Sequence, residues 1–344
     1  MNLQCVLESF LPLIEEELRA CVATPPKGAP EFFGMMQYHM GWRTECFDPI
    51  RASTGKRVRP LLTLLACQAA GGVPRRALPA AAAVEIIHNF SLVHDDIEDR
   101  SDLRRGRRTV WSLWGEAQAI NVGDGLFALA HLALHRLPQR GVPPERVASA
   151  LRVLDETCLA LCQGQHRDMA FEDSLNVDAD AYLGMIRGKT AALLSCAAWL
   201  GALVATDEAT TVERYGRIGE TLGLAFQIQD DVLGVWGEAG VTGKPVADDI
   251  RSRKKTLPIV YVLGKRDDLA AQQLRTLYAQ SCLTESEVAE AVAILDEAGA
   301  RAYAERLAGR YLDQALCEIE AVRPEPEAGE ALRELAHFLV QRAF

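Results

Sequence analysis

The sequence has few of the residues that build β-sheets. Ile, Thr and Tyr are sparse, Ala and Leu dominate, and aromatic residues make up only 6% of the 344 residues. Because Ala and Leu favour helices while β-branched and aromatic residues favour strands, this composition predicts an all-α protein. No Ser/Gly-rich or highly charged linker divides the chain. We therefore expect one large helical domain that spans residues 1–344.

The chain also lacks an excess of positive charge. Its formal net charge is −10, and it is basic only in short stretches. Proteins that hold nucleic acids by the phosphate backbone usually carry a broad basic surface. We therefore expect no nucleic-acid partner, and we expect the short basic stretches to bind a small polyanion.

Signals for export, membrane insertion and disulfide bonds are missing as well. The longest uncharged apolar run, residues 191–205, has 15 residues, whereas a membrane-spanning helix needs roughly 20. Glu8 and Glu15 interrupt the N-terminal apolar pattern, which has no basic leader and is not typical of a signal peptide. The nine cysteines form no CxxC pair, so we expect buried thiols rather than a disulfide framework. These absences predict a cytoplasmic protein without a transmembrane segment.

Proline and glycine divide the chain into long helical stretches. Helices of this length, joined by short breaks, predict a bundle, and bundles build metal sites from side chains on facing helices. The stretches run over about 1–22, 57–70, 79–100, 109–136, 145–172, 178–205, 208–236 and 256–277, and three more follow up to residue 344.

Two acidic motifs lie near the ends of apolar helical stretches. The first acidic motif is Asp95-Asp96-Ile97-Glu98-Asp99, and the second begins with Asp230-Asp231, which Gln227 precedes by one helical turn. Carboxylates at positions i and i+4 share one face of a helix. Their hard oxygens suit Mg²⁺, which usually keeps waters and bridges to substrate phosphates. The two motifs therefore predict a site for Mg²⁺ and a diphosphate.

Cationic residues accompany both motifs. Arg104 and Arg105 follow the first motif at a turn with Gly106, and paired guanidinium groups can fork onto phosphate oxygens. Lys56 and Arg59 lie at a helix start, where backbone N–H groups also favour an anion. Taken singly, an acidic face, an arginine patch or a packed histidine has an ordinary structural explanation, and only their order and spacing point to a shared site. The other polar residues of this pattern are His88, Ser91, Lys189, Thr190, Lys244 and Lys254.

In order and spacing, these motifs resemble the all-trans isoprenyl diphosphate synthases, also called polyprenyl synthetases. The resemblance covers residues from about 55 to 258. It implies a homodimeric, all-helical enzyme with a central cavity lined by the two acidic motifs. It also implies a Mg²⁺-dependent head-to-tail (1'-4) condensation of isopentenyl diphosphate with an allylic diphosphate, with about three Mg²⁺ ions per active site when substrate is bound.

The resemblance also assigns roles to individual residues. Asp95, Asp99, Asp230 and Asp231 are expected to bind the metal ions. Arg104, Lys189, Thr190, Gln227, Lys244 and Lys254 are expected to bind the allylic diphosphate. Lys56, Arg59, His88 and Arg105 are expected to bind isopentenyl diphosphate. Gln165 and Asp168 fit a position on the cavity wall. The residues expected to carry catalysis are Asp95, Asp99, Arg104, Lys189 and Asp230.

The second acidic motif departs from the family pattern at Gly234. Many relatives carry a third Asp at this position, one turn after Asp230. One ligand of Mg²⁺ is therefore expected to be replaced by water, or by Asp248 or Asp249, which follow nearby in the sequence.

Product length is expected to depend on the residues one turn before the first acidic motif. Phe90 and Ser91 stand five and four residues before Asp95, and the motif itself has no insertion. A bulky aromatic residue at the first of these positions resembles the pattern of geranylgeranyl diphosphate synthases, which make a C20 product. The alternatives are that Phe90 is ordinary core and another helix closes the tail pocket, or that the product is farnesyl or a longer prenyl diphosphate.

Two other functions compete with this interpretation. A class I terpene cyclase also uses a DDxxD motif, but its second metal motif is Asn/Asp-x-x-Ser/Thr-x-x-x-Glu, and it lacks a subsite for a second diphosphate. A non-catalytic subunit of a heteromeric synthase tends to lose the Asp motifs, which are present here. Both comparisons favour the synthase.

Overall fold

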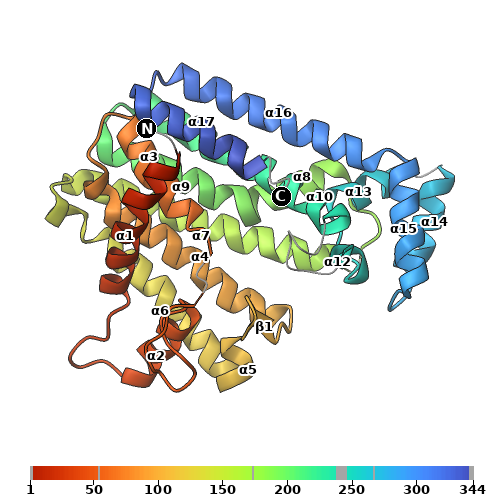
Figure 1. Cartoon of the computed structure of the whole chain (residues 1–344), viewed down its shortest axis with the longest axis horizontal. Helices are drawn as coiled ribbons and strands as arrows, with labels where there is room; N and C mark the ends of the chain where they lie inside the picture. Colours follow the sequence, from red (N-terminus) through yellow and green to blue (C-terminus); the bar gives the residue numbers. More distant parts are fainter. Residues whose placement is uncertain (1–2, 53–54, 173, 238–245, 266–267, 341–344) are drawn as a thin grey trace. The chain divides into compact units, whose positions relative to one another are not determined.

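The computed structural model describes residues 3–52, 55–172, 174–237, 246–265 and 268–340. Over these residues it consists of helices and one small hairpin, which confirms the predicted all-α class (Figure 1). The chain divides into two compact units. Unit 1 comprises residues 1–156, 196–215 and 324–332, and unit 2 comprises 157–195, 216–323 and 333–344. The prediction of a single domain stays a prediction.

Unit 1 is organised around α4 (Leu78–Glu98), which packs against α6 (Glu116–Leu134), α3 (Val58–Ala69) and α1 (Leu3–Cys21) (Figure 1). Every residue from 78 to 87 is buried. Apart from Glu85, this half of α4 is apolar on all sides, as expected of a helix surrounded by others. The other elements of unit 1 are α2 (Pro30–His39), η1 (Pro74–Ala77), β1 (Leu103–Arg104), β2 (Arg107–Arg108), α5 (Val110–Trp114), η2 (Leu137–Arg140) and the first part of α7 (Pro144–Glu172).

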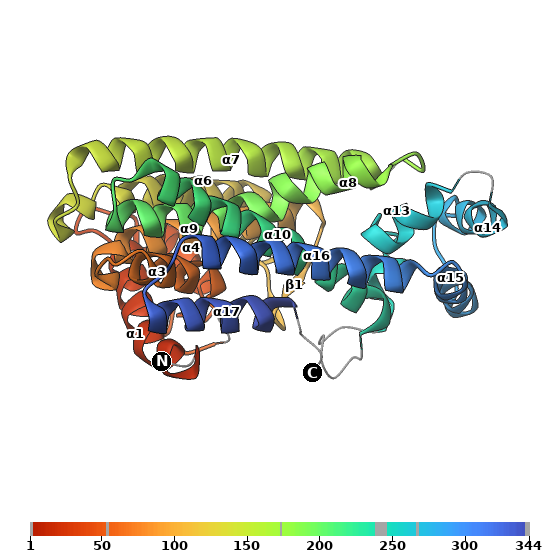
Figure 2. The same ribbon diagram turned by 90° about the horizontal axis from the view of Figure 1, so that it is seen from above.

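Unit 2 contains most of α10 (Ala209–Trp236) and a set of C-terminal helices. Among them, α13 (Leu257–Leu263), α14 (Leu269–Tyr278) and α15 (Glu285–Glu297) pack on one another around a common apolar core (Figure 2). The remaining elements of unit 2 are α8 (Ala179–Ile186), the π-helical turn η3 (Arg187–Ala191), α12 (Asp248–Arg251) and α16 (Ala300–Ala321). Two further helices, α9 (Ala192–Ala205) and α17 (Pro326–Val340), have residues in both units.

Most of the predicted helical stretches agree with the structure, including 1–22, which corresponds to α1, and others are divided into shorter helices. The stretches at 57–70, 79–100, 145–172 and 208–236 correspond to α3, α4, α7 and α10. The stretch at 109–136 is divided into α5 and α6 by Gly115, whose φ of 85° ends one helix and begins the next. The stretch at 256–277 is likewise two helices, α13 and α14. A lone glycine inside an amphipathic pattern is compatible with either outcome, so the sequence did not reveal the first break.

The cysteines are distributed differently from the prediction. Cys67, Cys158 and Cys196 are buried, as expected. The prediction of buried thiols is wrong for five others, because three of them lie on exposed faces of helices and two lie in the connections between helices. The exposed thiols are Cys5, Cys46, Cys162, Cys282 and Cys317.

One helical stretch, Ala179–Ala205, has the length and composition of a membrane-spanning helix. Most of its apolar window is buried inside the structure. Core helices of globular proteins often meet the same criteria, so this stretch is weak evidence for a membrane segment.

Candidate active site

The first acidic motif forms the C-terminal end of α4. The backbone N–H of Asp99 donates to the carbonyl of Asp95 at 2.8 Å, which places the two residues one turn apart. Asp95 is half-buried and Asp99 is exposed, whereas Asp96 between them is buried. The C-terminal end of a helix carries partial negative charge and favours cations. The motif therefore presents two accessible carboxylates where a cation is stabilised.

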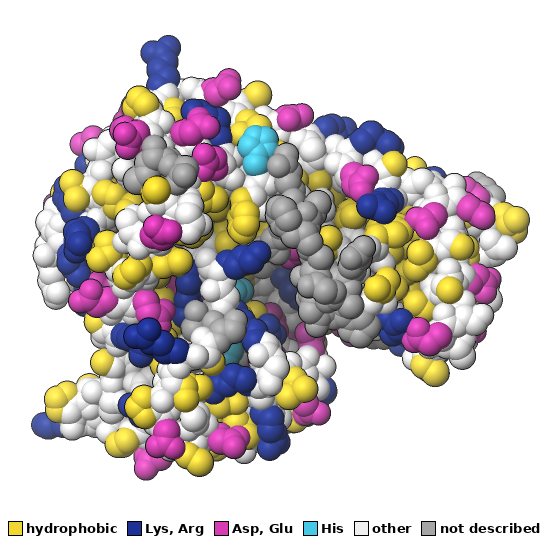
Figure 3. All heavy atoms as spheres, in the orientation of Figure 1, with side chains coloured by type: hydrophobic (Ala, Val, Ile, Leu, Met, Phe, Trp, Pro, Cys, Tyr) yellow, Lys and Arg dark blue, Asp and Glu magenta, His cyan; other side chains and the backbone are white. Residues whose placement is uncertain are grey.

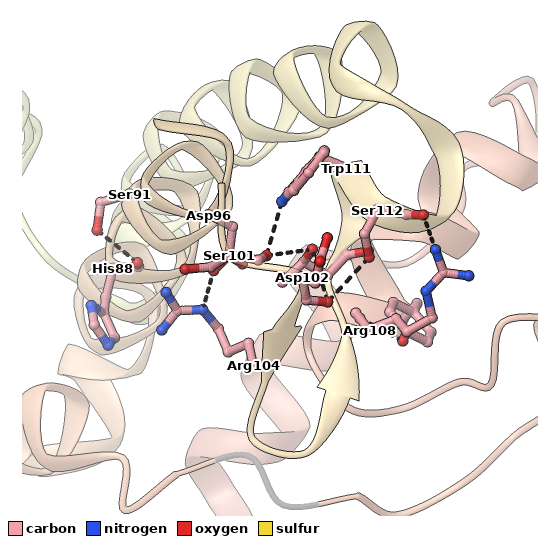
Figure 4. A network of polar contacts seen from close by, with 11 residues as sticks. His88, Ser91, Asp96, Ser101, Asp102, Arg104, Arg108, Trp111 and Ser112 are labelled. Atoms are coloured by element: carbon pink, nitrogen blue, oxygen red, sulfur yellow. Dashed lines mark hydrogen bonds and ion pairs between the residues drawn. The ribbon is translucent and has the colours of Figure 1, made fainter. Parts of the chain in front are cut away.

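Asp96 holds Arg104 in place. The Nε of Arg104 donates to Oδ1 of Asp96 at 2.8 Å (Figure 4). Burial raises the pKa of Asp96 to about 6, against the opposing charge of Arg104. The hydrogen bond to Asp96 thus fixes the position of the Arg104 side chain, which is only half-buried.

Arg105 stands at the tip of the hairpin formed by β1 and β2. The two turn residues, Arg105 and Gly106, both have positive φ, 52° and 74°. This is the conformation of a two-residue hairpin turn that follows the strand twist. A Cβ on Gly55 would lie 3.0 Å from an Arg105 guanidinium nitrogen, so Gly55 leaves room for this side chain.

The other cations of the hairpin have structural partners. Arg107 donates to the carbonyls of Tyr38 at 3.0 Å and Arg43 at 2.7 Å, and it lies over the Tyr38 ring. After the hairpin, the indole N–H of Trp111 donates to the carbonyl of Ser101 at 2.9 Å (Figure 4). The sequence run of four arginines therefore separates into Arg104 and Arg105, which the resemblance assigns to substrate, and a pair that braces the hairpin.

A similar separation occurs before α3. Arg57 is buried, with Nη1 2.6 Å from Oε1 of Glu85 and Nη2 3.4 Å from Oε2 of Glu15. Its left-handed backbone, with φ of 49°, turns it away from its neighbours. Lys56 is exposed and Arg59 is half-buried. In this segment, the two residues predicted to bind isopentenyl diphosphate, Lys56 and Arg59, are thus more accessible than Arg57.

Two histidines lie among these cations. His88 of α4 is half-buried, and burial together with the charges of Arg59 and Arg105 holds its pKa well below its usual value. His39, the last residue of α2, was not identified from the sequence. Burial lowers its pKa to about 3, with further contributions from Arg104 and other arginines.

Both imidazoles are therefore neutral at pH 7. The Nε2 of His39 is buried and has no hydrogen-bond partner among the described residues. Figure 3 shows Lys and Arg side chains gathered close to histidine side chains on the viewed face. A concentration of positive charge beside neutral hydrogen-bonding groups is suited to a polyanion.

The predicted chain-length residue Phe90 belongs to an aromatic cluster between α4 and α6. Its ring lies edge-on to His94, with centroids 4.9 Å apart, and to Phe127 of α6, at 5.5 Å. A Cβ on Gly123 would lie 2.1 Å from Nε2 of His94, so only glycine admits this histidine. Phe127 is a second candidate for closing a tail pocket. The sequence did not point to it, because it lies far from Phe90 along the chain. Ser91 donates to the carbonyl of His88 at 2.9 Å (Figure 4).

In unit 2, Asp231 of the second acidic motif is buried and already bonded. Its Oδ2 accepts hydrogen bonds from the hydroxyl of Tyr182 and from the backbone N–H of Leu257, the latter at 2.9 Å. Its Oδ1 accepts from the amide of Gln227 at 3.1 Å, and Gln227 in turn accepts from Thr190 at 2.8 Å. Burial raises the pKa of Asp231 to about 7, although these hydrogen bonds oppose the rise.

This geometry does not favour Asp231 as a metal ligand, since both oxygens serve the protein. Asp230, its neighbour, is half-exposed.

Lys189 lies in the π-helical turn η3 and pairs with Asp168 of α7. The two backbones approach closely here, because a Cβ on Gly164 would lie 2.2 Å from the Lys189 nitrogen. Gln165, next to that glycine, is half-buried. Predicted residues from α7 and η3 are therefore brought together.

Lys254 and Lys255 are adjacent in sequence but have different environments. Lys254 is exposed, whereas Lys255 is buried, donates to the carbonyl of Glu172 at 3.1 Å and lies over the ring of Tyr278. The prediction named Lys254, the accessible one. Lys244, also predicted, lies outside the described residues.

Among the residues that the structure describes, no metal site is made of protein groups alone. In the described ranges, no group of three or more His, Cys, Asp or Glu side chains could hold a metal ion. The accessible oxygens of Asp95 and Asp99 nevertheless suit Mg²⁺, which takes one or two carboxylates and completes its shell with water and substrate phosphate. The donor set fits Mg²⁺ only in the presence of a phosphate ligand.

Comparisons with known proteins agree on one family. The sequence model described as polyprenyl synthetase matches residues 41–295. Geranylgeranyl diphosphate synthase of Mycobacterium tuberculosis H37Rv is 44% identical over 292 residues, covering 84% of this chain and 82% of that protein. The (2E,6E)-farnesyl diphosphate synthase of the same strain is 39% identical over 319 residues, covering 91% and 87%.

Solved structures agree as well. Polyprenyl synthetase from Streptomyces coelicolor A3(2) has a TM-score of 0.91 at 36% identity, covering 98% of this chain and 100% of that one. Geranylgeranyl pyrophosphate synthetase from Pyrococcus horikoshii has a TM-score of 0.86 at 35% identity, covering 98% of both chains.

Proposed function

Because the chain belongs to the polyprenyl synthetase family, we propose that it condenses isopentenyl diphosphate with an allylic diphosphate. The reaction is head-to-tail (1'-4), releases diphosphate and gives an all-trans prenyl diphosphate. The proposed product is geranylgeranyl diphosphate, with farnesyl or a longer prenyl diphosphate as the alternative. The curated relatives include both farnesyl and geranylgeranyl diphosphate synthases.

One observation supports the proposal most strongly. In three places, the charged residue predicted to meet substrate is accessible, while its sequence neighbour is buried in a structural contact. The accessible and buried members of these pairs are Lys56 and Arg57, Asp95 and Asp96, and Lys254 and Lys255. The accessible members are the charged groups that a metal ion or a diphosphate could reach from solvent.

The residues divide the chemical work as follows. Asp95, Asp99 and Asp230 would hold Mg²⁺, which, when bound, stabilises the charge of the departing diphosphate. Arg104 and Lys189, with Thr190, Gln227, Lys244 and Lys254, would bind the allylic diphosphate. Asp231 would keep Gln227 oriented through its hydrogen bond.

Isopentenyl diphosphate would meet Lys56, Arg59, Arg105 and His88. The C–O bond of the allylic substrate breaks, the double bond of isopentenyl diphosphate attacks the resulting cation, and a proton is lost to the departing diphosphate. No protein nucleophile is required. Neutral His88 can donate one hydrogen bond to an anion without adding charge.

We also propose that the enzyme is a cytoplasmic homodimer. Ile120 and Leu132 on α6 are exposed large apolar side chains, 47% and 59% accessible. A second copy of the chain would cover them.

Product analysis tests the proposal. The purified chain is incubated with Mg²⁺, isopentenyl diphosphate and, separately, dimethylallyl, geranyl or farnesyl diphosphate, and the dephosphorylated products are separated by chromatography. We expect a C20 alcohol. Hydrocarbon released from geranylgeranyl diphosphate alone would identify a cyclase instead, and an inactive chain would point to a non-catalytic subunit.

A further inference from the structure

The space beside Gly234, the glycine of the second acidic motif, is filled by a side chain from another helix. A Cβ on Gly234 would lie 1.8 Å from Oδ2 of Asp249 and 2.5 Å from its Cγ. Both separations are far shorter than any carbon contact with a non-bonded atom, which is about 3.5 Å or more at its optimum. The carboxylate of Asp249 therefore fills the space in which a side chain at position 234 would begin.

The short helix α12 that carries Asp249 is held by its last two residues. Ile250 is fully buried and belongs to the same apolar core as Val235 of α10. Arg251 forms two hydrogen bonds with the carboxylate of Glu285, at 2.8 and 2.7 Å. Figure 1 shows α12 by the C-terminal end of α10. The position of Asp249 over Gly234 thus follows from packing that does not involve its own side chain.

The charge of Asp249 also acts on the second motif. Burial is the main cause of the raised pKa values of Asp231 and of Tyr182, the hydroxyl partner of Asp231, and the charge of Asp249 adds a smaller increase to both. Coulombic effects of this kind require a short separation in a partly buried site. Asp249 therefore belongs electrostatically, as well as sterically, to the acidic face of α10.

We propose that Asp249 supplies, from α12, the carboxylate that the second acidic motif lacks at Gly234, and that glycine at this position is needed to admit it. Asp230 and position 234 are one turn apart and share a face of α10. With Asp249 over that face, the motif keeps two carboxylates for Mg²⁺ and a diphosphate. This inference rests on the proposed function.

The structure also distinguishes Asp249 from Asp248. The sequence allowed either residue to replace the missing Asp. Consecutive residues of a helix point about 100° apart, and the three atoms nearest to a Cβ at position 234 all belong to Asp249. Asp248 is therefore a matched control, with the same charge on the same turn.

Four variants test the proposal through binding rather than turnover. Thermal unfolding of the full chain is followed with fixed inorganic diphosphate and increasing Mg²⁺. Asp249→Asn should raise the Mg²⁺ concentration that gives half-maximal stabilisation by about tenfold or more, the usual effect of losing a group that supports a metal site. Gly234→Ala should act in the same direction, because the added methyl group displaces the carboxylate. Asp248→Asn should match the wild type.

The fourth variant, Gly234→Asp with Asp249→Ala, returns the carboxylate to α10 and should restore the Mg²⁺ dependence. If Gly234→Ala fails to fold, this variant and Asp249→Asn still decide the matter. The inference is overturned if Asp249→Asn behaves as wild type, or if its defect is not restored by moving the carboxylate. A wild-type chain that neither responds to Mg²⁺ with diphosphate nor condenses substrates would instead refute the proposed function.

Discussion

Replacing Phe90 by alanine should lengthen the prenyl chain of the product. Phe90 precedes Asp95 by five residues on α4, which places it about 7.5 Å along the helix axis at 1.5 Å per residue. A tail that starts from a diphosphate at the first acidic motif and follows α4 meets this ring. Its removal deletes a group slightly larger than one isoprenoid unit, so we expect the main product to change from C20 to C25 and longer.

The variant should remain folded. It loses two edge-on contacts, with His94 and Phe127, each worth about 0.5–1.5 kcal/mol beyond the area buried. Even with a further loss from the space left behind, the cost is smaller than a typical unfolding free energy of about 5–15 kcal/mol. A decrease of about 1–3 kcal/mol from these contacts is measurable by urea unfolding, which also verifies that the products come from a native enzyme.

The assay is chromatography of the dephosphorylated products from isopentenyl and farnesyl diphosphate. Ser91→Phe should act in the opposite sense and shorten products toward C15. Phe33→Ala is a suitable control, because it removes a ring that packs edge-on against Phe32 of α2, and it should leave the product unchanged. If Phe90→Ala still stops at C20, the reasoning is refuted, and Phe127 of α6 becomes the first residue to test as the floor.

Three further predictions concern charge. Asp95→Ala should lower turnover by ~10²-fold or more, and excess chelator should abolish wild-type activity; full activity in either case would contradict the metal assignment. Arg59→Ala should raise the KM for isopentenyl diphosphate more than that for the allylic substrate in initial-rate kinetics, and the reverse pattern would exchange the two subsites. Because the pKa of His39 is about 3 when folded against 6.5 ordinarily, the unfolded state binds more protons below pH 6.5. The contribution of neutral His39 to the free energy of unfolding is therefore fully present above pH 6.5 and is lost as the pH falls toward 3. Between pH 7 and 5, wild type should lose about 2 kcal/mol more unfolding free energy than His39→Gln, and equal losses would show that His39 is ordinarily solvated.

The sequence sufficed for the helices that carry the acidic motifs, because proline and glycine mark their ends. Glycines at 71 and 72 follow α3 closely, and Pro79 lies in the first turn of α4. It did not indicate α2, whose ten residues include Gly34 and carry no clear apolar period. His39 was missed for that reason.

Sequence also cannot determine which of two neighbouring charges turns inward. Arg57 is buried because a left-handed backbone and Glu85, far away in sequence, place it there. The approach of Asp249 to Gly234 is of the same kind, since it depends on the packing of α12 rather than on local pattern. The candidate residues could thus be named in advance, while their division into structural and ligand-facing groups required the fold.

The π-helical turn at Arg187–Ala191 has a consequence for how this segment can change in length. A turn of this kind holds about one residue more than an α-helical turn. Deleting one residue would leave the number that an α-helical turn holds, so the helix that follows would keep its rotation, but the residues inside the turn would shift and Thr190 would move relative to Gln227. The close approach of Gly164 and Lys189 leaves no room for the backbone to compensate. Substitutions at exposed positions here should therefore be tolerated far better than single-residue insertions or deletions.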